Sequence, residues 1–184
     1  KCFKIKRREG SISVDFYRTD FQNQIIVDVD SDARKVIISN LDGQSFANSF
    51  QAQLDYEVFP RFDVRLAYRF YDVKANYGLQ LLSRPLLAQH RAFANFAYSS
   101  KKDWKYDLTV NWQGEKRIPS LMSNPPELKG LDKSPSFFIV NAQVSKTFRE
   151  IFDVYLGVEN ALDYVQENPI VSASDPYGKY FDAS

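Results

Sequence analysis

Residues 104–112 alternate strictly between apolar and polar side chains and have a tryptophan at each end. The apolar positions are Trp104, Tyr106, Leu108, Val110 and Trp112. Because successive side chains of a strand point to opposite faces, this spacing predicts a strand with one apolar and one polar face. On a strand tilted by ~40°, eight residues of ~3.3 Å each separate the two indoles by ~20 Å along the tilt axis. This is close to the height of the apolar band of a membrane-spanning β-barrel, whose boundaries carry aromatic rings.

The same two-residue period recurs in six further segments, which predicts strands rather than helices. Clear alternation covers residues 11–17, 50–58, 62–70 and 152–159. The pattern is weaker in 89–99 and in 138–145, because Phe93 and Ile139 fall on the polar side. With residues 3–7 added, the chain holds about eight candidate strands.

Short and long connections alternate between these candidate strands. Short turns are predicted near Arg8–Gly10, Phe59–Arg61, Ser100–Asp103 and Arg149–Glu150, and long loops at 30–44, 77–88, 117–135 and 161–184. Short turns at one end and long loops at the other are typical of outer-membrane barrels. We therefore predict an all-β fold, namely an antiparallel up-and-down transmembrane β-barrel segment with Trp104 near the periplasmic rim and Trp112 near the outer rim.

The bulk composition narrows the possible functions. The 184 residues are 44% hydrophobic, but no apolar run reaches the ~18 residues of a transmembrane helix. A formal net charge of +1, with Lys and Arg spread along the polar positions, gives no argument for a nucleic-acid partner. Cys2 is the only cysteine and His90 the only histidine, so neither a disulfide within the chain nor a metal site is predicted.

Motifs of catalysis are missing from the sequence. There is no Ser-His-Asp combination, no Gly-x-Ser-x-Gly and no glycine-rich phosphate loop, so neither an enzyme nor a cofactor site is predicted. Asp28, Asp30 and Asp32 alternate as in a calcium loop, but the glycine and distal glutamate of an EF-hand are absent, which favours an exposed acidic loop. The prolines of the 117–135 loop exclude a ladder strand there and make it a candidate ligand-closing element.

Parity and strand direction select polar-face residues near the outer rim as candidates for ligand contact. They are Arg69, Tyr71, Arg91, Asn111 and Gln113. Two interpretations are open for these arginines and for Arg65. They form a basic lining that contacts an acidic ligand, or they pair with Asp63, Asp107 or Glu159 on neighbouring strands. On the other face, Phe50, Phe62, Phe70, Trp104 and Trp112 are expected to form aromatic girdles that meet lipid.

Several short strings, taken in order, resemble a known family. They are Asp15–Gln24, Ala67–Val73, Arg84–Leu86 followed by Gln89–Asn95, Gly157–Tyr164 with Asn168–Ile170, and Asp175–Asp182. The Gly-x-Glu-Asn-hydrophobic string at Gly157–Ala161 is the most recognisable. Together they resemble the C-terminal barrel half of TonB-dependent outer-membrane receptors, most closely those of the Bacteroidetes, over essentially all 184 residues.

The resemblance implies a fragment of a 22-stranded barrel whose lumen holds a plug domain. Residues 1–184 are then one β-barrel segment, with the plug domain and the terminal strand outside this chain. It also implies import of a scarce extracellular ligand, such as a siderophore, metal chelate, vitamin or oligosaccharide, across the bacterial outer membrane. Energy would come from TonB through an N-terminal region that this chain lacks, and the polar-face candidates would contact ligand or plug.

Two other classes of protein stay open on the sequence alone. A receptor-like barrel can serve as a binding subunit of a larger outer-membrane complex, with a surface lipoprotein as one partner. A soluble all-β binding domain would instead pack its apolar faces against each other.

Overall fold

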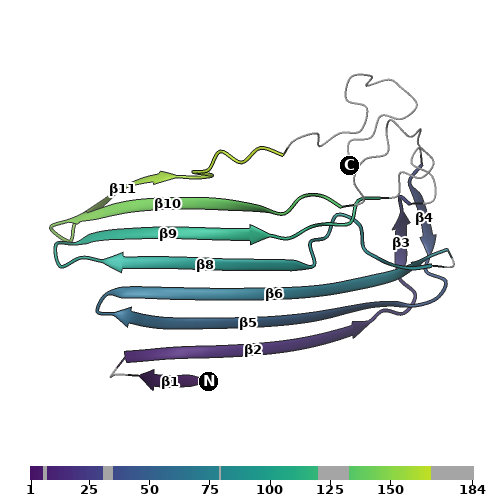
Figure 1. Ribbon diagram of the computed structural model, residues 1–184, viewed down its shortest axis with the longest axis horizontal. Coiled ribbons are helices and arrows are strands. Elements are labelled where there is room, and N and C mark those ends of the chain that lie inside the picture. Colours follow the sequence, from purple (N-terminus) through teal and green to yellow (C-terminus); the bar gives the residue numbers. More distant parts are fainter. Residues whose placement is uncertain (6–7, 31–34, 79, 120–132, 167–184) are drawn as a thin grey trace.

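The computed structural model describes residues 1–5, 8–30, 35–78, 80–119 and 133–166 (Figure 1). Its regular elements are strands: β1 (Cys2–Ile5), β2 (Arg8–Asp20), β3 (Ile25–Asp28), β4 (Ile37–Asn40), β5 (Ser45–Phe59), β6 (Phe62–Tyr77), β7 (Gln80–Ser83), β8 (His90–Ser99), β9 (Trp104–Gln113), β10 (Phe137–Phe148) and β11 (Phe152–Val158). In the part of the chain that the structure describes, no helix has the length and apolarity to cross a membrane.

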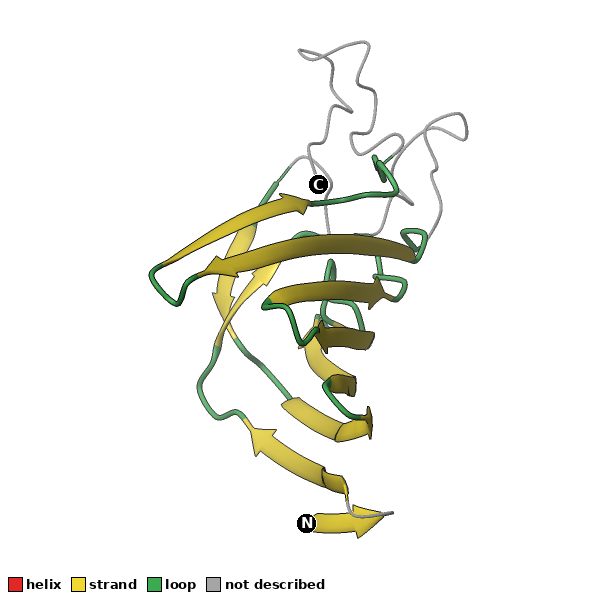
Figure 2. Cartoon of the chain, turned by 90° about the vertical axis from the view of Figure 1, so that its left-hand side faces the viewer, coloured by secondary structure: helices red, strands yellow, loops and turns green. Residues whose placement is uncertain are grey.

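Eight of these strands form one antiparallel sheet in the order β1-β2-β5-β6-β8-β9-β10-β11, and β7 pairs with the end of β6. The order follows the chain except for the inserted β3–β4 hairpin and β7, so the sheet is an up-and-down meander. Because β1 and β11 lie at its two edges, the described sheet is open, and Figure 2 shows it as a twisted wall. The predicted all-β, antiparallel, up-and-down fold is confirmed, and an open sheet is consistent with a fragment of a larger barrel.

The short connections lie together at one end of the sheet, which we call the inner end (Figure 1). Three predicted turns, at Phe59–Arg61, Ser100–Asp103 and Arg149–Glu150, are confirmed there. The turn predicted at Arg8–Gly10 is wrong, because these residues lie in β2 and pair with β1. Gly10 is not a turn residue here. A side chain at this position would lie 2.4 Å from the Phe3 ring, which covers the glycine.

The opposite, outer end of the sheet carries more strand than the sequence predicted. The loops expected at 30–44 and 77–88 contain β4 and β7, and β3 precedes the first of them. In addition, β2, β5 and β6 extend past their predicted ends, with Asp20 paired to Phe46 and Ser45 paired to Ala75. Alternation did not predict these extensions. In β6, for example, Tyr71, Val73 and Ala75 still alternate with Asp72 and Lys74, but with the opposite parity, so that polar residues take over the face that is apolar further in.

The large apolar side chains of the sheet are not gathered into a core. Among the described residues, the only buried hydrophobic ones are Ile26, Ala47, Ala75 and Ala88, all at the outer end. Side chains along one face are exposed instead, for example Phe16 at 64% and Leu156 at 75%. In a soluble β-sandwich a second sheet would cover such a face, and no described element does so.

Candidate functional site

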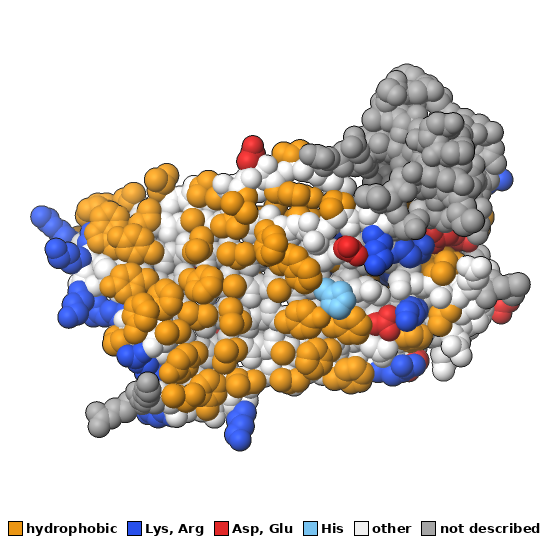
Figure 3. Space-filling view, viewed as in Figure 1, with side chains coloured by type: hydrophobic (Ala, Val, Ile, Leu, Met, Phe, Trp, Pro, Cys, Tyr) orange, Lys and Arg blue, Asp and Glu red, His pale blue; other side chains and the backbone are white. Residues whose placement is uncertain are grey.

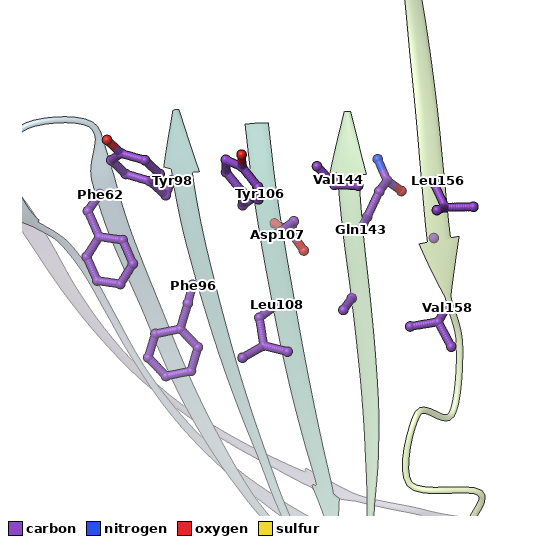
Figure 4. Close-up of a pocket in the computed structure, with 12 residues that line it drawn as sticks. Phe62, Phe96, Tyr98, Tyr106, Asp107, Leu108, Gln143, Val144, Leu156 and Val158 are labelled. Atoms are coloured by element: carbon purple, nitrogen blue, oxygen red, sulfur yellow. The ribbon is translucent and has the colours of Figure 1, made fainter. Parts of the chain in front are cut away.

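Cross-strand pairing places the apolar residues of neighbouring strands side by side, which forms a continuous surface that we call the apolar belt. Its central row is Ile12, Leu54, Leu66, Ala94, Val110 and Val140. Figure 3 shows the belt as a broad hydrophobic surface across the strands. Closer to the inner end, Figure 4 shows Phe62, Tyr98, Tyr106, Val144 and Leu156 on the same face, one each from β6, β8, β9, β10 and β11.

Aromatic rows border the belt at both ends. The outer row is Phe16, Phe50, Phe70 and His90, and the inner row contains Phe62, Tyr98 and Tyr106. Trp104 stacks on Tyr106 with ring centroids 6.4 Å apart. The Tyr68 hydroxyl lies 2.7 Å from Nδ1 of His90, so the histidine is held among aromatic rings.

Charged side chains lie directly beyond both borders of the belt. Beyond the outer aromatic row, Arg18 pairs with Asp20 at 2.7 Å and Lys74 with Asp72 at 3.4 Å, on the belt's own face. Figure 3 also shows basic side chains beyond the inner end. The predicted girdle residues Phe50, Phe62, Phe70, Trp104 and Trp112 all lie on the belt face. Their contact with lipid stays a prediction.

The opposite face carries the predicted polar residues. Gln51 pairs with Arg69, Arg69 with Arg91, and Arg91 with Gln113, so these four side chains form one row across β5, β6, β8 and β9. Strands are ~4.8 Å apart, so the row spans about 14 Å. We call it the arginine row.

The two remaining predicted residues lie next to the arginine row. Tyr71 follows Arg69 on β6, and the Arg69 guanidinium lies 4.8 Å from the centre of its ring. Asn111 lies one row further in, opposite Phe93 on β8. The structure therefore brings all five predicted polar-face residues together; their role in ligand or plug contact stays a prediction.

The counter-charges of this face differ from those predicted. Arg65 forms an ion pair with Asp55 rather than with Asp63, Asp107 or Glu159. Asp107 instead accepts hydrogen bonds from the Asn95 amide at 2.9 and 3.0 Å. Within the described residues, neither Arg69 nor Arg91 has an ion pair, although the two lie directly opposite each other.

Three apolar residues interrupt the polar face beside the arginine row. Phe93 and Ile139 lie on either side of Asn111, and Phe137 lies opposite Gln113. Together with the arginines, they line an open cavity of about 470 Å³. In the sequence, Phe93 and Ile139 are the two residues that break the alternation of their strands. That irregularity was the signal that could have identified this cavity.

At the outer end, an ion pair holds the β3–β4 hairpin to two other segments. The Arg117 guanidinium donates to both Asp30 carboxylate oxygens, at 2.8 and 2.7 Å, and its Nε donates to the Ser83 carbonyl at 2.6 Å. The expectation of an exposed acidic loop is wrong for Asp28 and Asp30. Asp28 is 7% exposed, and so is the Asp30 side chain, whose carboxylate pairs with Arg117. Burial also raises the pKa of the neighbouring Tyr77 phenol.

Several of the predictions for the long loops concern residues that the structure does not describe. Asp32, residues 120–132 of the proline-containing loop and residues 167–184, with the strings Asn168–Ile170 and Asp175–Asp182, lie outside the described residues. In the described ranges, no group of three or more His, Cys, Asp or Glu residues is placed to hold a metal ion.

The Gly157–Ala161 string has a clear structural role at the end of β11. Asn160 adopts a φ of 48°, a left-handed conformation that asparagine tolerates better than most residues. Its side chain accepts from the Tyr164 amide and donates to the Tyr164 carbonyl, both at 3.0 Å. The backbone N–H of Asn160 donates to the Asn141 side-chain oxygen on β10 at 2.9 Å. The asparagine therefore closes the turn and ties it to the sheet.

An open antiparallel sheet with a belt of this kind on one face and polar side chains on the other defines a segment of a membrane-spanning β-barrel wall. The family model described as "TonB dependent receptor-like, beta-barrel" matches residues 3–161, so the chain belongs to this family. Its members are outer-membrane transport receptors that work with TonB and an extracellular ligand; they are not enzymes.

Two solved structures share the fold. One is the ferric-catecholate import receptor Fiu from E. coli K12 in its closed form, with 15% identity and a TM-score of 0.62 over 89% of this chain and 22% of that one. The other is the siderophore receptor PiuA from Acinetobacter baumannii, with 14% identity and a TM-score of 0.57 over 84% of this chain and 22% of that one. The chain thus spans about a fifth of these receptors. No curated protein matches it.

Proposed function

We propose that this chain is part of the wall of a TonB-dependent outer-membrane transporter that imports a scarce ligand, such as a siderophore, metal chelate, vitamin or oligosaccharide. The observation that carries the proposal is the division of one sheet into two faces. A belt bounded by aromatic rings and then by charge suits lipid. The opposite face, with its arginines, amides and open cavity, suits a water-filled lumen.

On this proposal, the girdle residues Phe50, Phe62, Phe70, Trp104 and Trp112 meet the lipid of the outer membrane, and the arginine row with Tyr71 and Asn111 faces the ligand or the plug. TonB acts through a region outside this chain. The two solved relatives are named as a ferric-catecholate receptor and a siderophore receptor, which makes a siderophore the first ligand to test. The family strings in the sequence support a receptor of the Bacteroidetes type.

The test is uptake of a radiolabelled ferric siderophore by cells that carry the full-length receptor. Uptake should require both the receptor and TonB, and it should be lost in cells that lack either one. Uptake that continues without TonB would contradict the proposal.

One observation favours a second function, a binding subunit of a larger outer-membrane complex. The β3–β4 hairpin buries Ile26 on one side but exposes Ile25, Val27 and Ile38 at 64%, 50% and 69% on its other side. An apolar surface beyond the belt is a candidate contact for a surface lipoprotein. Copurification of a lipoprotein that is lost in an Ile25→Ser/Ile38→Ser variant would support this function.

A further inference from the structure

Two arginines of the arginine row face each other without a carboxylate between them. Arg69 and Arg91 are direct cross-strand partners, whose Cβ atoms lie ~4.5–5.5 Å apart. Asp55 is held by Arg65, and Asp15 lies two strands away from Arg69, about 10 Å distant. Because like charges directly opposite each other destabilise a sheet, this pair costs stability until a negative group lies between the guanidinium groups.

The neighbours of the pair extend it into a site with several hydrogen-bonding groups. The Tyr71 ring lies 4.8 Å from the Arg69 guanidinium and orients it, while Gln51 and Gln113 add an amide on each side. Guanidinium groups bind carboxylate, phosphate and similar anionic oxygens through paired hydrogen bonds. The row is therefore suited to a ligand with more than one negative oxygen.

An apolar surface adjoins these charges on the same face. Phe93 and Ile139 lie one row further in, and Ala67 opposite Phe93 leaves room above the sheet. The result is the open cavity of about 470 Å³, lined by arginines on one side and apolar side chains on the other. A ligand that covers Phe93 and Ile139 removes apolar surface from water, which favours binding.

We propose that this cavity binds an anionic ligand with an apolar edge. Its negative oxygens lie between Arg69 and Arg91, and its apolar part lies on Phe93 and Ile139. This inference rests on the proposed function and deepens it, because it selects charged, partly apolar ligands over neutral ones. The competing occupant is a carboxylate of the receptor's own plug domain, and the test separates the two.

The experiment is a titration of the purified full-length receptor, followed by tryptophan fluorescence, with two ferric chelates of different charge. A ferric tricatecholate is anionic and aromatic, and a ferric trihydroxamate is neutral. We expect the tricatecholate to bind at least ~10-fold more tightly. Arg69→Gln and Arg91→Gln should each weaken its binding by about 10- to 100-fold, the range expected for hydrogen bonds to charged groups. Phe93→Ala should weaken it less.

The matched control is Arg65→Gln, which removes the same charge from the same strand and face. Asp55 already neutralises Arg65, so tricatecholate binding should stay within about twofold of wild type. A second readout is thermal unfolding of the ligand-free receptor. If no anion lies between the arginines, Arg91→Gln should leave the midpoint unchanged or raise it.

The proposal is overturned if the neutral chelate binds as tightly, if the arginine variants bind like wild type, or if neither chelate binds. A lower unfolding midpoint for ligand-free Arg91→Gln would assign the arginines to the plug instead. Failure of the proposed function has a different signature, namely uptake that does not require TonB. If the arginine variants keep both TonB-dependent uptake and normal chelate binding, the anion site is refuted but the proposed function is not.

Discussion

The two faces of this sheet are built from the same strands, yet they follow different rules. On the belt face, each row between the outer and the inner aromatic border is apolar, and charged side chains begin only beyond these borders. On the polar face, neighbouring positions differ from one another, and an ion pair, a hydrogen-bonded aspartate and two opposed arginines lie within a few rows. A face with the same chemistry in every row suits a uniform surrounding such as lipid. A face whose neighbouring positions differ in chemistry suits contacts with particular groups of a ligand or protein.

The largest expected effect is a charge placed in the middle of the belt. Val110→Arg should destabilise the barrel in the membrane by ~2–4 kcal/mol, because the new charge would lie near the bilayer midplane. Thr109→Arg changes the adjacent residue on the polar face and should be far milder, although it removes the hydroxyl that bonds Asp107 and Asn95. Folding titrations in lipid vesicles measure both, and equal costs would refute the assignment of the two faces.

A smaller and more local effect is expected at the outer end, beyond the apolar belt. Arg117→Gln should destabilise the β3–β4 hairpin by about 2–3 kcal/mol, because it leaves the largely buried Asp30 carboxylate without its guanidinium. Hydrogen exchange of the hairpin amides should become faster, while exchange in β9 stays the same. An Asp30→Asn/Arg117→Gln double variant should cost less than the sum of the two single variants, and strict additivity would argue against a direct pair.

The smallest effect is expected at the turn after β11, which belongs to neither face of the sheet. Asn160→Ala should cost about 1–2 kcal/mol, since it loses the bonds to Tyr164 and places alanine at a positive φ. Asn160→Asp keeps an acceptor for the Tyr164 amide and should cost less. Protease cleavage after β11 can rank the variants. The reverse order would mean that the side chain does not close this turn.

How far the sequence predicted the molecule depends on whether a segment lies within the belt. There, the bilayer requires apolar residues at every second position, so the strands from 50–58 to 152–159 and the facing of Arg69 and Arg91 could be predicted from parity. Outside the belt that constraint ends, and the extensions of β5 and β6 were missed. The Arg117–Asp30 pair joins residues 87 positions apart, and no local pattern encodes such a contact. The partner of Arg65 likewise depends on strand register.

The most direct test of the account is the environment of successive side chains along β9. With Cys2 replaced by serine, single cysteines at positions 104–113 of the full-length receptor in lipid vesicles would each carry a nitroxide label. We predict that oxygen, which concentrates in lipid, relaxes the labels at even positions, and that a water-soluble nickel chelate relaxes those at odd positions. Equal access of the two reagents at even and odd positions would contradict the claim that this sheet separates lipid from a polar lumen.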